Sequence, residues 1–303
     1  MANAKKKSQK KLKTSMLRAL TATAVFAVVA IGLAFATGTG TLSSLGWNSV
    51  AAICPLGALE SLLGAKAIAV RSLIALAGAV IIFVLAGKAF CSWVCPVPHF
   101  QNLFKSRKDK QVEAQARSKA ADRSLERWEK GETVKREAVD SRHAVLGGAL
   151  LSTAIFGFPV FCLVCPVGLI FATFILFWRL IQFNEPTIGS IIFPVILIVE
   201  LLVFKRWCGV ICPLGALMSL ISKANKTFKP QVNTEICLRS DGSSCKACAS
   251  ACPEHIDPVN NLGDRSVDEC VRCKSCSDVC PAGAILFPFF AKNDNKEEVE
   301  ERA

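Results

Sequence analysis

The amino-acid sequence predicts a mainly α-helical protein: a four-span membrane domain with an internal two-fold repeat, followed by a small separate C-terminal domain. Hydrophobic residues make up 52% of the 303 residues, and long apolar runs recur through the first two thirds of the chain. The two halves of that region carry similar cysteine–proline motifs. The apolar runs stop near Lys223, where a cysteine-rich segment follows, so a change of domain is expected there.

The net charge of +12 accompanies the apolar runs. The basic residues concentrate in the tail 1–14 and in the segment 105–142, both beside predicted membrane segments. The tendency of basic loops to stay inside explains this placement without any nucleic acid. We therefore expect no nucleic-acid partner and place both basic segments on the cytoplasmic side of the inner membrane.

Four apolar runs are long enough to cross a hydrocarbon core of roughly 30 Å. The first resembles a signal peptide, but we expect it to be retained because it belongs to the repeat. Four crossings give a multi-pass protein with both termini in the cytoplasm. Each outer turn also holds a shorter apolar piece, expected to be re-entrant or interfacial. The predicted spans are 16–36, 72–90, 144–161 and 188–206, and the shorter pieces are 51–63 and 167–182.

The charged segment between the second and third spans has a helical composition and little apolar content. It predicts a solvated cytoplasmic loop, with docking to a partner as the alternative. The predicted divisions of the chain are the basic tail 1–14, the first membrane repeat 15–104, the charged loop 105–142, the second membrane repeat 143–225, the cysteine-rich domain 226–290 and a disordered tail 291–303.

Each membrane half reads as a helix, an outer turn with Cys-Pro, a second helix and an inner Cys-x3-Cys-Pro motif. Two copies with the same orientation predict a pseudo-two-fold axis along the membrane normal. Such an axis brings four thiols together at the inner surface, which suits one [4Fe–4S] cluster or another Cys₄ centre. The alternative is cysteine without a metal, acting as a small hydrophobic residue. The four are Cys91, Cys95, Cys208 and Cys212.

The same axis gathers three further thiols near the outer surface. Ala51 occupies the position of a fourth, so a cluster there needs one ligand other than cysteine. Cysteine without a metal is again the alternative. The three are Cys54, Cys162 and Cys165.

The C-terminal cysteines form the most specific motif in the chain. The run Cys270-x2-Cys273-x2-Cys276-x3-Cys280-Pro281 is that of bacterial ferredoxins, in which the fourth cysteine binds the other cluster. An upstream copy starts at Cys237 and stretches the first gap to seven residues. A zinc ribbon, the alternative, gives no reason for the trailing proline. A ferredoxin-like domain with two [4Fe–4S] clusters is therefore predicted, one held by Cys237, Cys245, Cys248 and Cys280, the other by Cys270, Cys273, Cys276 and Cys252.

Together these motifs resemble the NapH-type membrane ferredoxins, quinol dehydrogenase components of periplasmic nitrate reduction that are related to the NosR and MauN proteins. The resemblance covers roughly residues 15–285 and rests on the spans, the paired Cys-x3-Cys-Pro motifs and the C-terminal double motif. It implies that the inner cysteines are functional and that the C-terminal domain carries two clusters. The outer cysteines and the long charged loop are not part of that pattern, and the extra thiols suggest a further redox centre.

The first functional hypothesis is electron transfer from menaquinol or ubiquinol, through the clusters, to a partner iron–sulfur or cytochrome protein and a terminal reductase. The chain would then be the quinol dehydrogenase subunit of a larger complex, and an occupied outer site would carry electrons across the membrane. Quinol oxidation also needs a proton acceptor. Glu200, within the fourth apolar run, is one candidate, because ionisable residues within spans are functional by default. Glu60, beside the first outer turn, is the other. The alternatives are a metal-reducing assembly, maturation or regulatory accessory protein, and a structural anchor.

Overall fold

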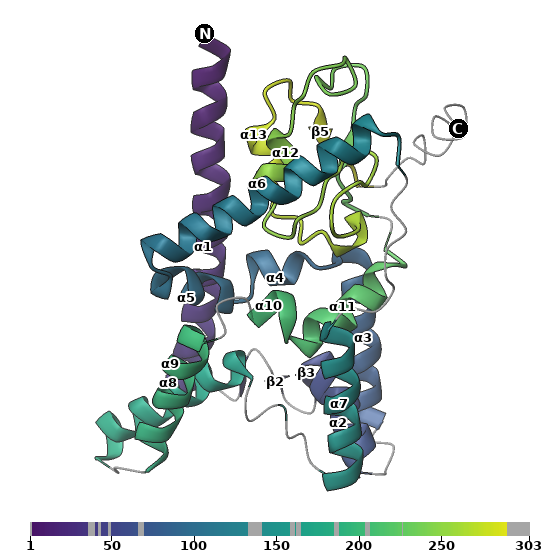
Figure 1. Cartoon of the computed structure of the whole chain (residues 1–303). Helices are drawn as coiled ribbons and strands as arrows, with labels where there is room; N and C mark the ends of the chain where they lie inside the picture. The colour runs from purple at the N-terminus through teal and green to yellow at the C-terminus, as the bar shows by residue number, and fades with distance from the viewer. Residues whose placement is uncertain are drawn as a thin grey trace.

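The computed structural model shows a chain that is mostly helix, which confirms the predicted fold class at that level (Figure 1). A small domain of loops and short elements lies at one end of the helices. The structure describes residues 2–35, 40–41, 44–47, 50–65, 70–132, 141–157, 161, 165–184, 188–203, 207–225 and 227–289.

The first half begins with a long helix whose apolar part, Thr14–Gly32, is 19 residues long and has the length and composition of a membrane span. A three-stranded antiparallel sheet follows. Pro55 then starts the next helix, where its missing N–H costs nothing. The elements of this half are α1 (Ala2–Ala34), β1 (Gly40–Thr41), β2 (Ser44–Trp47), β3 (Val50–Ile53), α2 (Pro55–Ala65), α3 (Val70–Ala86), α4 (Ala89–Trp93) and α5 (Val97–Phe104).

The second half holds the other helix with the length and composition of a membrane span. The piece at 167–182, predicted as a re-entrant or interfacial helix, belongs to one continuous helix of 18 residues, Pro166–Phe183, and its position in the bilayer stays a prediction. Arg179 interrupts the apolar run but not the helix, which ends where Asn184 takes the left-handed conformation (φ 50). The elements are α7 (Ser141–Phe156), α8 (Pro166–Phe183), α9 (Gly189–Val203), α10 (Trp207–Val210) and α11 (Pro213–Ser222).

The other three predicted spans form shorter helices. Helices α3, α7 and α9 have 17, 16 and 15 residues, and α9 contains Pro194. A helix of that length measures roughly 22–26 Å, less than the thickness of the hydrocarbon core. By length and composition, the described residues therefore contain two helices that can cross a membrane. The four-span arrangement stays a prediction.

The helices of the two halves pack across one another. Helix α2 contacts α3 and α7, while α8 contacts α9 and α1. Helix α11 contacts α3, and α5 contacts α9; α4 contacts α1, and α10 contacts α7. These contacts form matching pairs. In each pair, the helices of one contact are replaced in the other by the helices at the same place in the other half of the chain.

Two small cores lie where helices of the two halves contact each other. In one, Leu56 of α2, Leu146 of α7 and Ala216 of α11 are buried together. In the other, the ring of Phe26 on α1 lies 6.1 Å from that of Phe100 on α5, with Ile170 of α8 buried in the same cluster. These cores hold residues near the starts of α2, α5, α8 and α11, each of which begins at, or directly after, the proline of a Cys-Pro motif.

The C-terminal domain has little regular structure. Strands β4 (Gln231–Val232) and β5 (Ile285–Leu286) pair antiparallel and bring the two ends of the domain together. Its buried residues include Val232, Val259 and Ile285, and its cysteines lie among them. The remaining elements are α12 (Ala247–Ala251), the 3₁₀ helix η2 (Val267–Glu269) and α13 (Ser275–Val279).

The charged segment that the sequence assigned to a solvated loop contains a 23-residue helix, α6 (Arg107–Glu129), that contacts α12 of the C-terminal domain. Ser106 and Asp109 form a capping box at its start. Near its other end, Arg123 forms an ion pair with Asp264 at 2.6 Å, and Trp128 packs against the core of the domain. The segment therefore forms a strap across the C-terminal domain (Figure 1).

Candidate metal centres

A cavity in the C-terminal domain is lined by four cysteines and otherwise mostly by apolar residues. The lining suits an iron–sulfur group because four thiols contribute to it and most of its other residues are apolar. The gap of seven residues after Cys237 does not prevent that cysteine from reaching the cavity. We call these the first C-terminal set: Cys237, Cys245, Cys248 and Cys280.

The other four cysteines of the domain also come together. The thiol of Cys276 lies near enough to those of Cys252, Cys270 and Cys273 for their charges to act on one another. The loop between them places Arg272 (φ 53) in the left-handed conformation, and the Arg272 amide donates to the Cys270 sulfur at 3.4 Å. Left-handed turns of this kind form concave groups of N–H donors that suit an anion. We call Cys252, Cys270, Cys273 and Cys276 the second C-terminal set.

Burial raises the pKa of Cys252 to about 12 and that of Cys270 to about 11. Burial likewise raises the pKa of Cys248, in the first C-terminal set, to about 12. A thiolate in such surroundings needs a positive charge beside it, and ligated iron supplies one. The chemistry of these donors therefore fits a metal cluster.

In the membrane part, four thiols from both halves meet. The thiol of Cys208 has those of Cys91, Cys95 and Cys212 as electrostatic neighbours. Cys212 is the N-cap of α11, and its sulfur accepts a hydrogen bond from the Gly215 amide at 3.4 Å. Helix N-termini favour negative charge, so this geometry suits a thiolate-bound cluster. We call these residues the inner membrane set: Cys91, Cys95, Cys208 and Cys212.

Two of the three cysteines assigned to an outer site are electrostatic neighbours of each other, and one of them is also a neighbour of the inner membrane set. Cys165 is an electrostatic neighbour of Cys95 and Cys212 in the inner membrane set, and of Cys54. The thiol of Cys165 is therefore close enough to the inner set for their charges to interact. Cys162 lies outside the described residues.

Both carboxylates predicted for proton transfer are electrostatic neighbours of Cys165. The side chains of Glu60 and Glu200 are 0% and 5% exposed, and both act electrostatically on the Cys165 thiol. Within the described part of the chain, neither carboxylate oxygen of Glu200 has a hydrogen-bond partner.

The second C-terminal set faces the inner membrane set across the contact between the two parts of the chain. Ser92 of α4 donates to the Val271 carbonyl at 2.9 Å, and the Trp93 indole donates to the Arg272 carbonyl at 3.2 Å. The carboxylate of Glu254 is an electrostatic neighbour of thiols in both sets. The two sets are thus arranged in series.

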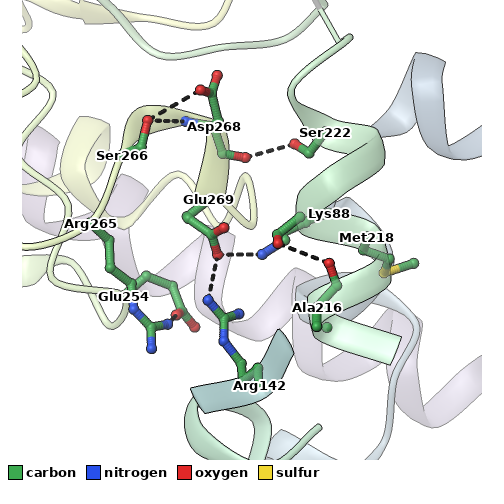
Figure 2. Close-up of polar contacts among 12 residues, drawn as sticks. Lys88, Arg142, Ala216, Met218, Ser222, Glu254, Arg265, Ser266, Asp268 and Glu269 are labelled. Atoms are coloured by element: carbon green, nitrogen blue, oxygen red, sulfur yellow. Dashed lines mark hydrogen bonds and ion pairs between the residues drawn. The ribbon is translucent and has the colours of Figure 1, made fainter. Parts of the chain in front are cut away.

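A buried ion network closes this contact, as Figure 2 shows. Glu269, which precedes Cys270, accepts from Lys88, the N-cap residue of α4, and from Arg142 on α7, the latter at 3.0 Å. Burial alone would raise the pKa of Glu269, but the two cations outweigh it and hold that pKa below its ordinary value. Sequence reasoning missed this network because the three residues lie far apart in the chain and belong to no motif.

Within the described residues, no three His, Cys, Asp or Glu side chains converge closely enough to hold a single metal ion.

Residues 68–112 and 186–231 match a family described as a 4Fe-4S binding domain, and residues 265–286 match a second family with the same description. Each of the first two segments contains one Cys-x3-Cys-Pro motif. These three segments of the chain are therefore similar to 4Fe–4S binding domains.

Its relatives specify this class further. The ferredoxin-type protein NapH of Escherichia coli is 28% identical over 78% of this chain and 75% of its own length. The methylamine utilization ferredoxin-type protein MauN of Methylobacillus flagellatus is 28% identical over 82% of this chain and 79% of its own. These similarities confirm the resemblance to NapH-type ferredoxins.

A third relative, the putative electron transport protein YccM of Escherichia coli, is 29% identical over 68% of this chain. That alignment spans about half, 52%, of YccM itself. No solved structure matches the chain.

Proposed function

We propose that this protein is a membrane-bound electron carrier that links the quinol pool to a respiratory partner. The observation that carries the proposal is the series formed by the first C-terminal set, the second C-terminal set and the inner membrane set. A [4Fe–4S] cluster, when bound, supplies storage for one electron at each of these positions. Two clusters in the C-terminal domain and one at the inner membrane set would form a continuous path from the domain into the helices.

Several features support a position in a membrane with four crossings. Beyond the two long apolar helices, the shorter ones expose apolar side chains that water would solvate poorly. The exchanged helix contacts support a two-fold repeat, which pairs α3 with α9 as equivalent spans. Exposed apolar residues on these helices include Ile74, Ile81 and Ile82 of α3, Leu151 and Ile155 of α7, and Ile191, Val195 and Val199 of α9.

Glu60 and Glu200 are the residues we assign to proton transfer. A quinol loses two protons with its two electrons, and both must leave the apolar interior. Glu200 is buried and has no hydrogen-bond partner in the described structure, so it is placed to accept a proton near Cys165. The partner reductase and a partner iron–sulfur or cytochrome protein would then receive the electrons.

The test is anaerobic purification with counting of iron and sulfide, followed by addition of a quinol analogue. Three occupied sets correspond to about twelve iron atoms per chain, and the C-terminal sets alone to about eight. We expect about twelve, with reduction by the analogue visible by electron paramagnetic resonance (EPR). A count of eight contradicts the inner membrane cluster, and clusters that no quinol analogue reduces contradict the link to the quinol pool.

A further inference from the structure

The stretched gap in the upstream cysteine motif carries a buried arginine to the wall of the first cavity. Arg239 lies between Cys237 and Cys245, is 2% exposed and lines the same cavity as the first C-terminal set. A fully buried arginine is uncommon because its charge loses its hydration. The loop that holds it turns back at Gly242 (φ 88), so the longer gap provides room for this side chain.

Two of the three guanidinium nitrogens have protein partners. Nε donates to the Cys245 carbonyl at 2.7 Å, and Nη1 donates to Asp257 at 2.6 Å. Asp257 is itself fully buried and accepts from the Val259 amide at 3.0 Å. Within the described residues, Nη2 has no hydrogen-bond partner. A cavity that is lined by four thiols thus has a fixed, charged N–H donor without a protein acceptor in its wall.

We propose that Arg239 positions the cluster of the first C-terminal set and raises its reduction potential, by donating from Nη2 to a cluster or cysteine sulfur. The inference rests on the proposed function, which assigns a cluster to this cavity. Reduction adds one electron, taken from the neighbouring cluster of the second C-terminal set, and neither breaks a bond nor moves a proton. The added negative charge on the sulfurs strengthens a hydrogen bond from a cation, so the reduced form is favoured.

Asp257 has to be separated from this effect, because its charge also acts on the Cys248 thiol. In Arg239→Met the donor is lost and Asp257 is left as a buried anion, so the potential falls for two reasons. The double variant Arg239→Met with Asp257→Asn removes both charges and leaves only the loss of the hydrogen bond. Both variants should therefore lower the potential, the single variant by more.

The experiment is a redox titration of the full-length protein in detergent, with both C-terminal clusters followed by EPR. Arg239→Met should lower the equilibrium constant for electron transfer from the second cluster to the first at least tenfold. This corresponds to a reduction potential of the first cluster that is lower by ~59 mV for one electron. The double variant should lower the same equilibrium constant at least threefold. The potential of the second cluster should stay close to that of the wild type.

Lys246→Met is the matched control. Lys246 adjoins the ligand Cys245, but its side chain is 41% exposed and pairs with Asp122 of α6. Because solvent screens this charge, its removal should shift the potential less than Arg239→Met does. Equal shifts in the two variants, or a double variant with the wild-type potential, would overturn the proposal.

Assembly provides a second measurement if Arg239→Met loses iron. Arg239→Lys keeps a charge in the cavity wall, so retention of the first cluster in that variant supports the proposal. Loss of the cluster in both variants overturns it in favour of a residue needed only for folding. Absence of a first cluster from the wild-type protein would contradict the proposed function itself, which distinguishes the two failures.

Discussion

The substitution Glu269→Gln tests how the C-terminal domain is held against the membrane helices. The Glu269 carboxylate neutralises Lys88 and Arg142, and the exposed fractions of the three side chains are 16%, 3% and 4%. Glutamine keeps the shape of the side chain but not its charge. Two buried cations would then face each other without an anion between them.

Removing one partner of a buried ion pair costs about 3–5 kcal/mol, because an uncompensated charge stays buried. The domain should nevertheless remain folded and attached. Arg272 still donates to Asn225 at 2.5 Å, and Ser222 still donates to the Asp268 carbonyl at 2.6 Å. The lost free energy therefore shifts the equilibrium between the docked and the undocked C-terminal domain towards the undocked state. A loss of about 3 kcal/mol raises the undocked population roughly a hundredfold.

Hydrogen–deuterium exchange in lipid nanodiscs measures this opening. Backbone amides of α4 and η2 should exchange about a hundredfold faster in Glu269→Gln. The control is Asp268→Asn at the adjacent position, whose half-exposed ion pair with Lys229 contributes at most about 1 kcal/mol. Equal exchange rates in the two variants would refute the reasoning. Adding Lys88→Met and Arg142→Met to Glu269→Gln should restore much of the protection, because no buried charge then remains.

Three further predictions concern the membrane helices and their contact with the domain. Cys208→Ser should lower the iron content by about four atoms per chain and leave the EPR signals of the C-terminal clusters intact; an unchanged count would remove the inner membrane cluster. Glu200→Gln should slow quinol oxidation about a hundredfold at normal iron content, and wild-type turnover would exclude Glu200 from proton transfer. Gly87→Ala should lower the melting temperature, because φ is 55 there and a Cβ would meet the guanidinium of Arg272. The left-handed conformation alone costs about 1–2 kcal/mol. The control Gly78→Ala, which has nothing within 4 Å of its added Cβ, should not lower the melting temperature.

The cysteine sets show which parts of the site can be predicted from sequence. The run from Cys270 to Cys280 is local, because a tight loop brings its thiols together whatever the rest of the chain does. The inner membrane set could be proposed only through the repeat, since Cys91 and Cys208 belong to different halves. The surroundings of Cys165 could not be predicted, because its neighbours Cys95, Cys212 and Glu60 lie far from it in the sequence.

The charged residues that matter most were also invisible to sequence patterns. Glu269 and Arg239 each lie in a loop beside a cysteine, where a single charge has no periodicity and normally faces water. Their roles follow from burial, which only the folded chain establishes. For α6, the composition predicted a helix. It did not predict which face of that helix covers the C-terminal domain.

The distribution of charge in the folded chain explains how thiols in a low-dielectric region can hold anionic clusters. At Cys54, Cys95, Cys165 and Cys212 a proline follows the cysteine, and the sulfur accepts from backbone amides of the next residues. Helix N-termini thus supply donors without any charged side chain, so these sites avoid the cost of burying a cation. Full charges are instead used at the contact that holds the C-terminal domain in place, at Lys88, and beside the two C-terminal sets. Arg239 lines the cavity of the first set, and the buried Arg272 acts on the Cys270 thiol of the second. A buried cation beside each set offsets part of the negative charge that a cluster with cysteine ligands would carry.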